Sequence, residues 1–260
     1  MYLTWLDSNS WLIEMGGQRI LLDPWLVGPL VFGSMPWLFK SDRPKPRAIP
    51  SNIDLVLLSQ GLPDHAHPPT LQQLGKDIPV VGSPNAAKVA QNLGFKTITT
   101  LTHGSVMTIA DRVEIRAVPG SPIGPFTIEN GYILRDLEVG TSLYYEPHGY
   151  HSSDIRQFAP INVVITPVVD LVIPFLGPII QGNTTALQAV EWLQPQVMLP
   201  TAAGGDVTFE GLLLSILQAK GGTEEFSAAL AQQSPTTQFI CPKPGDRIDL
   251  STRLNMSAAV

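Results

Sequence analysis

The sequence predicts an α+β protein in which two mixed β-sheets pack face to face and helices cover their outer surfaces. Short apolar runs typical of strands recur along the whole chain, with helical segments interspersed in each half. The stretch "NIDLVLLSQ" (52–60) is almost continuously apolar, as expected for a central strand covered on both faces. The stretch "SPNAAKVAQNLG" (83–94) has a Ser N-cap, Pro at the first helical position and a terminal Gly, which predicts a helix.

The other elements follow from the same signals. The first 23 residues predict three strands, the last two joined by a hairpin turn at Gly16-Gly17. A long, proline-rich irregular loop is expected over 24–52. Further strands are predicted at 78–83, 97–101, 105–109, 113–118, 129–135, 141–145, 162–166, 196–199, 238–241 and 247–250, and further helices within 68–76, at 184–194, near 209–219 and at 223–232. Because no repeat or linker interrupts this order, we expect one domain over residues 1–260.

Composition excludes some classes of function. The net charge is −6 and no basic run occurs, whereas general nucleic-acid binding needs a basic surface. The chain has one cysteine, Cys241, so it has no intramolecular disulfide and fits a reducing compartment. The N-terminus does not resemble a signal peptide, and no stretch reaches the roughly 20 apolar residues of a membrane span. We therefore expect a cytoplasmic, soluble protein without a transmembrane segment.

The loop after the central strand contains several residues of the types that bind metals or act in catalysis. It reads Gln60-Gly61-Leu62-Pro63-Asp64-His65 and follows "DLVLLS" directly. This loop resembles the His-x-His-x-Asp-His motif of the metallo-β-lactamase fold superfamily, in particular its compact lactonase and phosphodiesterase-like branch. The resemblance extends to "RILLDPW" (19–25), "VEIRAVPGS" (113–121), "SLYYEPHG" (142–149) and "VMLPTAAGG" (197–205). It implies an αββα sandwich.

The resemblance also implies that one of the two usual metal sites is lost. In the family, the first metal is bound by the two His of His-x-His and by the His of the third motif. Gln60, Leu62 and Ser121-Pro122 occupy those places here. A leucine cannot bind a metal, and an amide oxygen is a poor ligand for zinc. The motif is therefore degenerate, and at most one metal is expected.

The ligands of the second metal are partly retained. Asp64 and His65 match the family pattern, whereas the bridging Asp falls near Glu146 and His148, and Ala202 or its neighbour replaces the last His. The resemblance thus implies either no cofactor or one divalent metal, zinc or manganese. Its ligands would be Asp64, His65 and either Glu146 or His148, with His67 as an outside candidate.

Two other interpretations of these residues remain open. Asp64 and His65 suit a purely structural turn, since Asp after Pro and before a helix is common turn chemistry. Alternatively, they form a metal-free acid–base pair with Glu146 and His148, which lie in "YYEPHGYH" (144–151). The candidate catalytic residues are accordingly Asp64, His65, Glu146 and His148.

Two loop segments are unusually apolar. "WLVGPLVFGSMPWLF" (25–39) has ten apolar residues in fifteen, and "PVVDLVIPFLGPII" (167–180) has nine in fourteen. The resemblance places both beside the active-site mouth, where they would bind an apolar ligand, form a homo-oligomer interface or touch a membrane surface, unless they are simply buried. The candidate ligand-binding residues are Asp23, Trp25, Trp37, Gln60 and Phe175.

Two functions follow from these observations. The first is a divergent hydrolase of a small ester, lactone or phosphodiester, including one with an apolar tail. The second is a non-catalytic descendant that uses the former mouth to bind a small molecule or a protein. The loss of the first metal site favours the second function, because that site supplies the family's hydrolytic chemistry.

Overall fold

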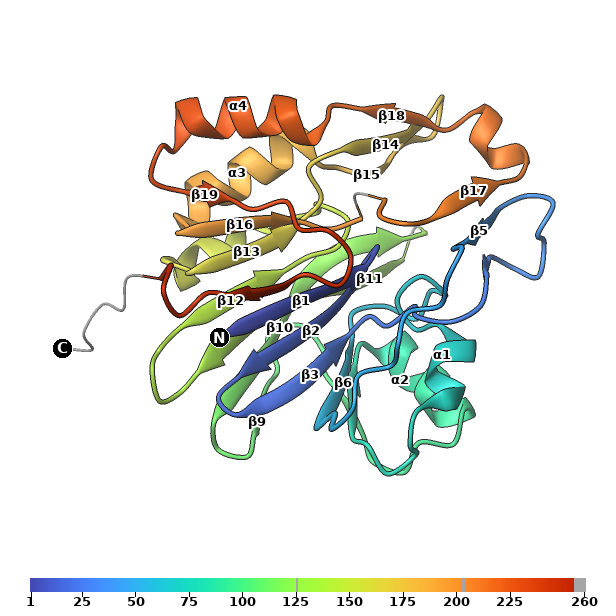
Figure 1. Ribbon diagram of the computed structural model, residues 1–260, viewed down its shortest axis with the longest axis horizontal. Helices are drawn as coiled ribbons and strands as arrows, with labels where there is room; N and C mark the ends of the chain where they lie inside the picture. Colours follow the sequence, from blue (N-terminus) through green and yellow to red (C-terminus); the bar gives the residue numbers. More distant parts are fainter. Residues whose placement is uncertain (125, 203, 255–260) are drawn as a thin grey trace.

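The computed structural model describes residues 1–124, 126–202 and 204–254. Within these residues, two seven-stranded sheets lie at the centre of the molecule (Figure 1). The order of the first sheet is β20 (Arg247–Asp249), β1 (Tyr2–Asp7), β2 (Ser10–Met15), β3 (Gln18–Leu22), β6 (Leu55–Leu58), β7 (Val80–Gly82) and β8 (Ile98–Thr100). Strands β1 to β3 pair antiparallel, and β3, β6, β7 and β8 are parallel. Both pairings follow the connections, because tight turns join antiparallel strands and longer crossovers join parallel ones.

The second sheet is mixed in the same way. Its order is β19 (Gln238–Phe239), β16 (Val197–Pro200), β13 (Val163–Thr166), β12 (Ser142–Tyr145), β11 (Thr127–Asp136), β10 (Val113–Ile123) and β9 (Val106–Ile109). Strands β12, β13, β16 and β19 run parallel, whereas β9 to β12 pair antiparallel. Of these parallel strands, β12, β13 and β16 are buried along their whole length, as expected for strands covered on both faces.

The main core fills the space between the two sheets. It combines Leu3, Trp11 and Ile20 of the first sheet with Tyr132 and Ile165 of the second, all of them fully buried. Each such large apolar side chain contributes about 1.5–3 kcal/mol when it is removed from water. This shared core holds the two sheets face to face.

Helices cover the outer faces of the two sheets. Helices α1 (Pro68–Gln73) and α2 (Pro84–Asn92) pack on the first sheet, whereas η1 (Ser153–Phe158), α3 (Asn183–Leu193) and α4 (Thr223–Gln233) pack on the second (Figure 1). The arrangement confirms the predicted α+β sandwich. No helix in the described part of the chain has both the length and the apolar character that crossing a bilayer requires.

The helix predicted near 209–219 is wrong. This segment contains β17 (Thr208–Glu210), a 3₁₀ turn η2 (Leu212–Ser215) and β18 (Gln218–Lys220). Gly211 has φ +116°, which no helix tolerates. Strand β17 pairs with β5 (Lys40–Asp42), which also pairs with β4 (Leu30–Val31), and β18 pairs with β14 (Asp170–Ile173), the partner of β15 (Gly177–Ile180). Pairing with available strand edges overrides the local helical pattern.

Strand ends position the polar residues. Asp23 directly follows β3, Ser59 follows β6 and Glu146 follows β12. Strand β3 is the parallel neighbour of β6, so Asp23 and Ser59 emerge at the same edge of the first sheet. Strand β12 contributes Tyr145 to the core between the sheets. Side chains from both sheets therefore meet at this edge.

The residue before α1, His67, has a structural role. Its imidazole Nδ1 accepts from the backbone N–H of Thr70 at 3.4 Å, and its Nε2 lies 3.2 Å from the carbonyl oxygen of Pro29. His67 is thus the N-cap of the helix and does not face the metal-ligand candidates, which corrects its assignment as an outside ligand. Burial lowers the pKa of His67 from 6.5 to about 4.

This depressed pKa predicts a loss of stability in acid. The unfolded chain takes up a proton at His67 near pH 6.5, whereas the folded chain does so only near pH 4, so stability falls as the pH drops between these values. Urea unfolding at pH 7 and pH 4.5 should show this contribution as about 2–3 kcal/mol. His67→Asn keeps an N-cap acceptor without a titrating group, and should lose that much less stability over the same range. An equal loss in both proteins would contradict the assignment.

Candidate metal centre

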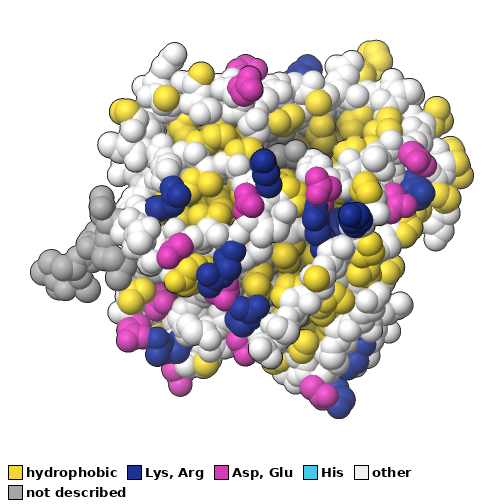
Figure 2. Space-filling model, in the orientation of Figure 1, with side chains coloured by type: hydrophobic (Ala, Val, Ile, Leu, Met, Phe, Trp, Pro, Cys, Tyr) yellow, Lys and Arg dark blue, Asp and Glu magenta, His cyan; other side chains and the backbone are white. Residues whose placement is uncertain are grey.

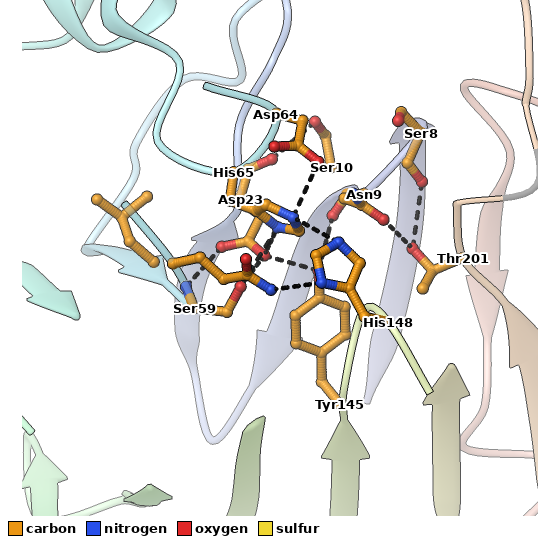
Figure 3. Close-up of polar contacts among 12 residues, drawn as sticks. Ser8, Asn9, Ser10, Asp23, Ser59, Asp64, His65, Tyr145, His148 and Thr201 are labelled. Carbon is orange, nitrogen blue, oxygen red and sulfur yellow. Dashed lines mark hydrogen bonds and ion pairs between the residues drawn. The ribbon is translucent and has the colours of Figure 1, made fainter. Parts of the chain in front are cut away.

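Three side chains converge on one point at the edge of the sheets (Figure 3). The Nε2 atom of His65 lies 3.1 Å from Oδ2 of Asp64 and 3.3 Å from Nε2 of His148. The ligand atoms of all three residues lie within 4.8 Å of one another, as the donors around a single cation do. His65 and His148 come from loops 83 residues apart in the chain.

Tight packing holds the His148 loop in place. The carbonyl oxygen of His148 accepts from the backbone N–H of Gln181 at 2.8 Å, which ties this loop to the segment before α3. The next residue, Gly149, has φ +76°, and a Cβ atom there would lie 1.4 Å from the carbonyl oxygen of Gln181. Only glycine fits at this approach. The position of His148 is therefore fixed by backbone contacts on the side away from the centre.

Asp23 holds His65 in position through a network of buried hydrogen bonds. Its buried carboxylate accepts from the backbone N–H of Ser59 at 2.7 Å, from the Ser59 hydroxyl at 2.5 Å, and from the Tyr145 hydroxyl at 2.7 Å. Oδ2 of Asp23 also lies 2.7 Å from Nδ1 of His65. This contact places the Nδ1 proton of His65 toward Asp23 and leaves Nε2 directed at Asp64 and His148. A carboxylate behind a histidine is the usual support of a metal ligand.

The charges at the centre suit a cation. Burial alone would lower the pKa of His65, but the carboxylates of Asp64 and Asp23 outweigh it and raise that pKa to about 10. Burial raises the pKa of Asp64, yet the neighbouring His65 outweighs this effect and keeps it below its usual value. Burial, together with the charge on His65, lowers the pKa of His148 to about 3. Without metal, His65 is therefore protonated. Its Nε2 proton lies between the Asp64 carboxylate and the neutral imidazole of His148.

The donor set fits a divalent metal. One carboxylate and two imidazole nitrogens form a combination that binds first-row divalent ions and leaves coordination positions open. Asp64 remains 18% exposed at its side chain, so the centre has access to solvent on that side. A cation bound by Asp64, His65 and His148 would take the place of the proton between them.

Glu146 is not among the described residues whose ligand atoms converge at this centre. Its Oε2 accepts from the backbone N–H groups of His148 at 3.1 Å and Tyr150 at 2.8 Å. Burial raises the pKa of Glu146 to about 8, although these amides partly oppose the shift. The carboxylate therefore shapes the loop that presents His148. The other oxygen, Oε1, is buried without a hydrogen-bond partner among the described residues, so the catalytic role expected for Glu146 stays a prediction.

The remaining candidates are distributed differently. Asp23 and Gln60 are fully buried inside the centre and do not line a ligand surface. Trp25 is only 1% exposed, with the Arg43 guanidinium 4.1 Å above its ring, so it is a core residue and does not line a mouth. Trp37 and Phe175 are exposed at the surface, and neither belongs to the group of ligand residues found among the described residues.

The sequence did not single out Ser59 or Tyr145, although both bind Asp23. Each lies at a strand end directly beside a residue of the recognised motifs, Gln60 and Glu146 respectively. That position is the only sequence signal, because their hydrogen bonds connect segments far apart in the chain. Ser121 was recognised only as a replaced ligand, and its hydroxyl in fact lies 2.9 Å from Nδ1 of His148.

A matched pair of tyrosine variants tests the support by Asp23. Tyr145→Phe removes the hydroxyl bound to Asp23, whereas Tyr144→Phe removes one that lies 3.0 Å from Nδ1 of His151, outside the centre. Each variant should lose about 1–2 kcal/mol of unfolding free energy in urea titrations, since each loses one buried hydrogen bond. Only Tyr145→Phe should also bind zinc about tenfold more weakly in calorimetric titrations. Equal zinc affinities in the two variants would refute the support.

Comparisons with known proteins agree with this architecture. A family described as the beta-lactamase superfamily domain matches residues 2–202. A protein named metal-dependent hydrolase from Caldivirga maquilingensis is 23% identical over 268 residues, covering 96% of this chain and 98% of its own. Another of that name, from Pyrococcus furiosus, is 29% identical over 215 residues, covering 76% of this chain and 82% of its own.

Solved structures show the same fold. The isothiocyanate hydrolase from Delia radicum gut bacteria superposes with a TM-score of 0.68 at 18% identity, covering 96% of this chain and 98% of its own. This likeness concerns the fold alone. The match over residues 2–202 confirms the resemblance found in the sequence, and the chain therefore belongs to the beta-lactamase superfamily, with the metallo-β-lactamase fold.

Proposed function

We propose that the protein is a hydrolase that uses one divalent metal, zinc or manganese, to cleave a small ester, lactone or phosphodiester. The observation that carries this proposal is the convergence of Asp64, His65 and His148 within 4.8 Å. The names of the relatives, which are metal-dependent hydrolases, support the same reaction class. A single centre with open positions is sufficient for hydrolysis in other metalloenzymes.

The protein's residues would divide the work as follows. A divalent ion in such a centre lowers the pKa of water and polarises the bond to be cleaved. Asp64, His65 and His148 would hold that ion, and Asp23 would keep the Nε2 lone pair of His65 directed at it. Glu146 would keep the His148 loop in its bent conformation. All of these roles consist of binding or orienting, and none of them requires a second metal ion.

Asp64 is the best placed group for proton transfer. Its Oδ1 has no hydrogen-bond partner among the described residues, whereas its Oδ2 faces His65. We infer that Oδ1 accepts a proton from the attacking water and returns it to the leaving oxygen, so that no net proton is gained by the protein. General catalysis of this kind contributes about 10²–10⁴-fold to a rate.

The non-catalytic alternative has less support from the geometry. A binding protein derived from this fold would not need two imidazole nitrogens to face each other at 3.3 Å in a buried site. Such an arrangement is unfavourable unless a proton or a cation lies between the nitrogens. Its retention, together with the Asp23 network behind it, favours a working metal centre over a remnant.

Metal content tests the proposal directly. Protein purified without chelator and supplied with zinc or manganese should hold about one equivalent by elemental analysis, and should hydrolyse members of a panel of esters, lactones and phosphodiesters. Asp64→Ala and His148→Ala should each hold less than a tenth of an equivalent and be inactive, because two donors rarely retain a metal. The exposed His103→Ala is the control and should behave as the parent. A parent protein that binds no metal would refute the proposal. A metal-loaded protein without activity would instead favour the non-catalytic binding function.

The homo-oligomer expected from the apolar segments stays a prediction. Trp37 is 65% exposed and Phe175 is fully exposed, and other exposed hydrophobic residues lie on β17 and η2. Figure 2 shows hydrophobic side chains on the face over β14, β15 and β17. Light scattering should therefore detect a dimer or larger. Replacing both Trp37 and Phe175 by Ser should yield monomers, whereas Phe126→Ser, an equally exposed position on another hairpin, should not. A monomeric parent protein would exclude this interface.

A further inference from the structure

The places of two lost metal ligands are occupied by a pair of side chains that bind His148. Gln60 and Ser121 are both buried, and they contact each other through Nε2 of Gln60 and Oγ of Ser121 at 2.9 Å. Nδ1 of His148 lies 2.9 Å from Nε2 of Gln60 and 2.9 Å from Oγ of Ser121. The three polar groups thus form a closed triangle behind the imidazole ring.

The two nitrogens of His148 therefore have separate environments. Nε2 faces His65 and Asp64, and Nδ1 faces Gln60 and Ser121. A neutral imidazole carries its proton on one nitrogen and a lone pair on the other. If Nε2 is to bind a cation, the proton must be on Nδ1, where it needs an acceptor. The tautomer of His148 is consequently decided by what Gln60 and Ser121 offer to Nδ1.

Gln60 can satisfy either tautomer, because its amide has both a donor and an acceptor end. With its nitrogen toward His148, the amide donates to an unprotonated Nδ1, and this requires the His148 proton on Nε2, opposite the proton that His65 carries without metal. Rotated by half a turn, it presents its oxygen to Nδ1–H and leaves the Nε2 lone pair for a cation. The Ser121 hydroxyl also works both ways, since it can donate to Nδ1 or accept from it. A methionine could do neither, and a carboxylate could only accept.

We propose that Gln60 and Ser121 are positioning residues that set the proton of His148, with the Gln60 oxygen and Ser121 accepting from Nδ1–H when the centre holds a cation. The inference rests on the proposed metal function. Under this proposal, Gln60 and Ser121 are more than replacements of two family ligands. They support the metal site that remains. The triangle also occupies the place of the first metal's ligands, which limits the centre to one ion.

The experiment combines ¹⁵N NMR of histidine-labelled protein with calorimetric zinc titration. Zinc is diamagnetic, so the shifts of both His148 ring nitrogens can be followed with and without it. Gln60→Met removes donor and acceptor at similar length, Gln60→Glu retains only an acceptor, and Ser121→Ala is the milder change. The exposed Gln91→Met is the control for the substitution itself.

The parent protein with zinc should show the proton on Nδ1 and zinc on Nε2. Gln60→Glu should place the proton on Nδ1 even without zinc, and should bind zinc at least as tightly as the parent. Gln60→Met should bind zinc about 10–100-fold more weakly, and Ser121→Ala about tenfold more weakly, as the loss of a supporting hydrogen bond predicts. Gln91→Met should match the parent in both measurements.

Two results would overturn the inference. One is zinc affinity unchanged in Gln60→Met and Ser121→Ala, and the other is a ¹⁵N shift of His148 Nδ1 that is the same in zinc-loaded parent, Gln60→Met and Ser121→Ala protein. If Gln60→Met fails to fold, Gln60→Glu and Ser121→Ala still decide the matter. A parent protein that takes up no zinc would refute the proposed function, yet the ¹⁵N shift of His148 Nδ1 in metal-free parent and Gln60→Met protein would still support or refute the role of Gln60, because a hydrogen-bonded Nδ1 changes its shift when its partner is removed.

Discussion

The structure depends on one buried carboxylate, that of Asp23. Its oxygens receive hydrogen bonds from Ser59 at the end of β6 and from Tyr145 at the end of β12, so it ties the two sheets together at the edge where the centre lies. It also faces Nδ1 of His65. A buried carboxylate is costly unless several donors satisfy it, and here four contacts do so. The same interaction therefore stabilises the fold locally and orients His65, a candidate metal ligand.

The candidate centre and the residues at the positions of the family's first-metal ligands are in direct contact. Asp64, His65 and His148 lie close enough for one ion, and the places of the first metal's ligands are filled by groups that hydrogen-bond to His148. A motif compared position by position with the family pattern looks degenerate, because two of its four characteristic residues are missing. In three dimensions, Gln60 and Ser121 at these positions contact His148.

Sequence reasoning predicted the fold well because its signals are local. The central apolar run 52–60 became β6, and the capped segment 83–94 became α2. The failure at 209–219 has a physical reason. The apolar residues there fit a helical period, but Gly211 breaks the helix, and the edges of β5 and β14 offer backbone partners that no local pattern reveals. Trp25 was mispredicted for the same reason, because its contacts are with residues distant in the chain. It was expected to line a surface and lies in the core against Arg43.

For the centre, the sequence by itself determined which residue types were available: an Asp-His pair after a central strand, a second cluster at 146–148, and no ligands for a first metal. Only the tertiary structure decided between Glu146 and His148. The loop after β12 bends so that the Glu146 carboxylate accepts from its own backbone amides, while packing of Gly149 against Gln181 turns the His148 ring toward His65. Such a choice depends on contacts between segments distant in the chain, and these do not exist until the two sheets have packed together.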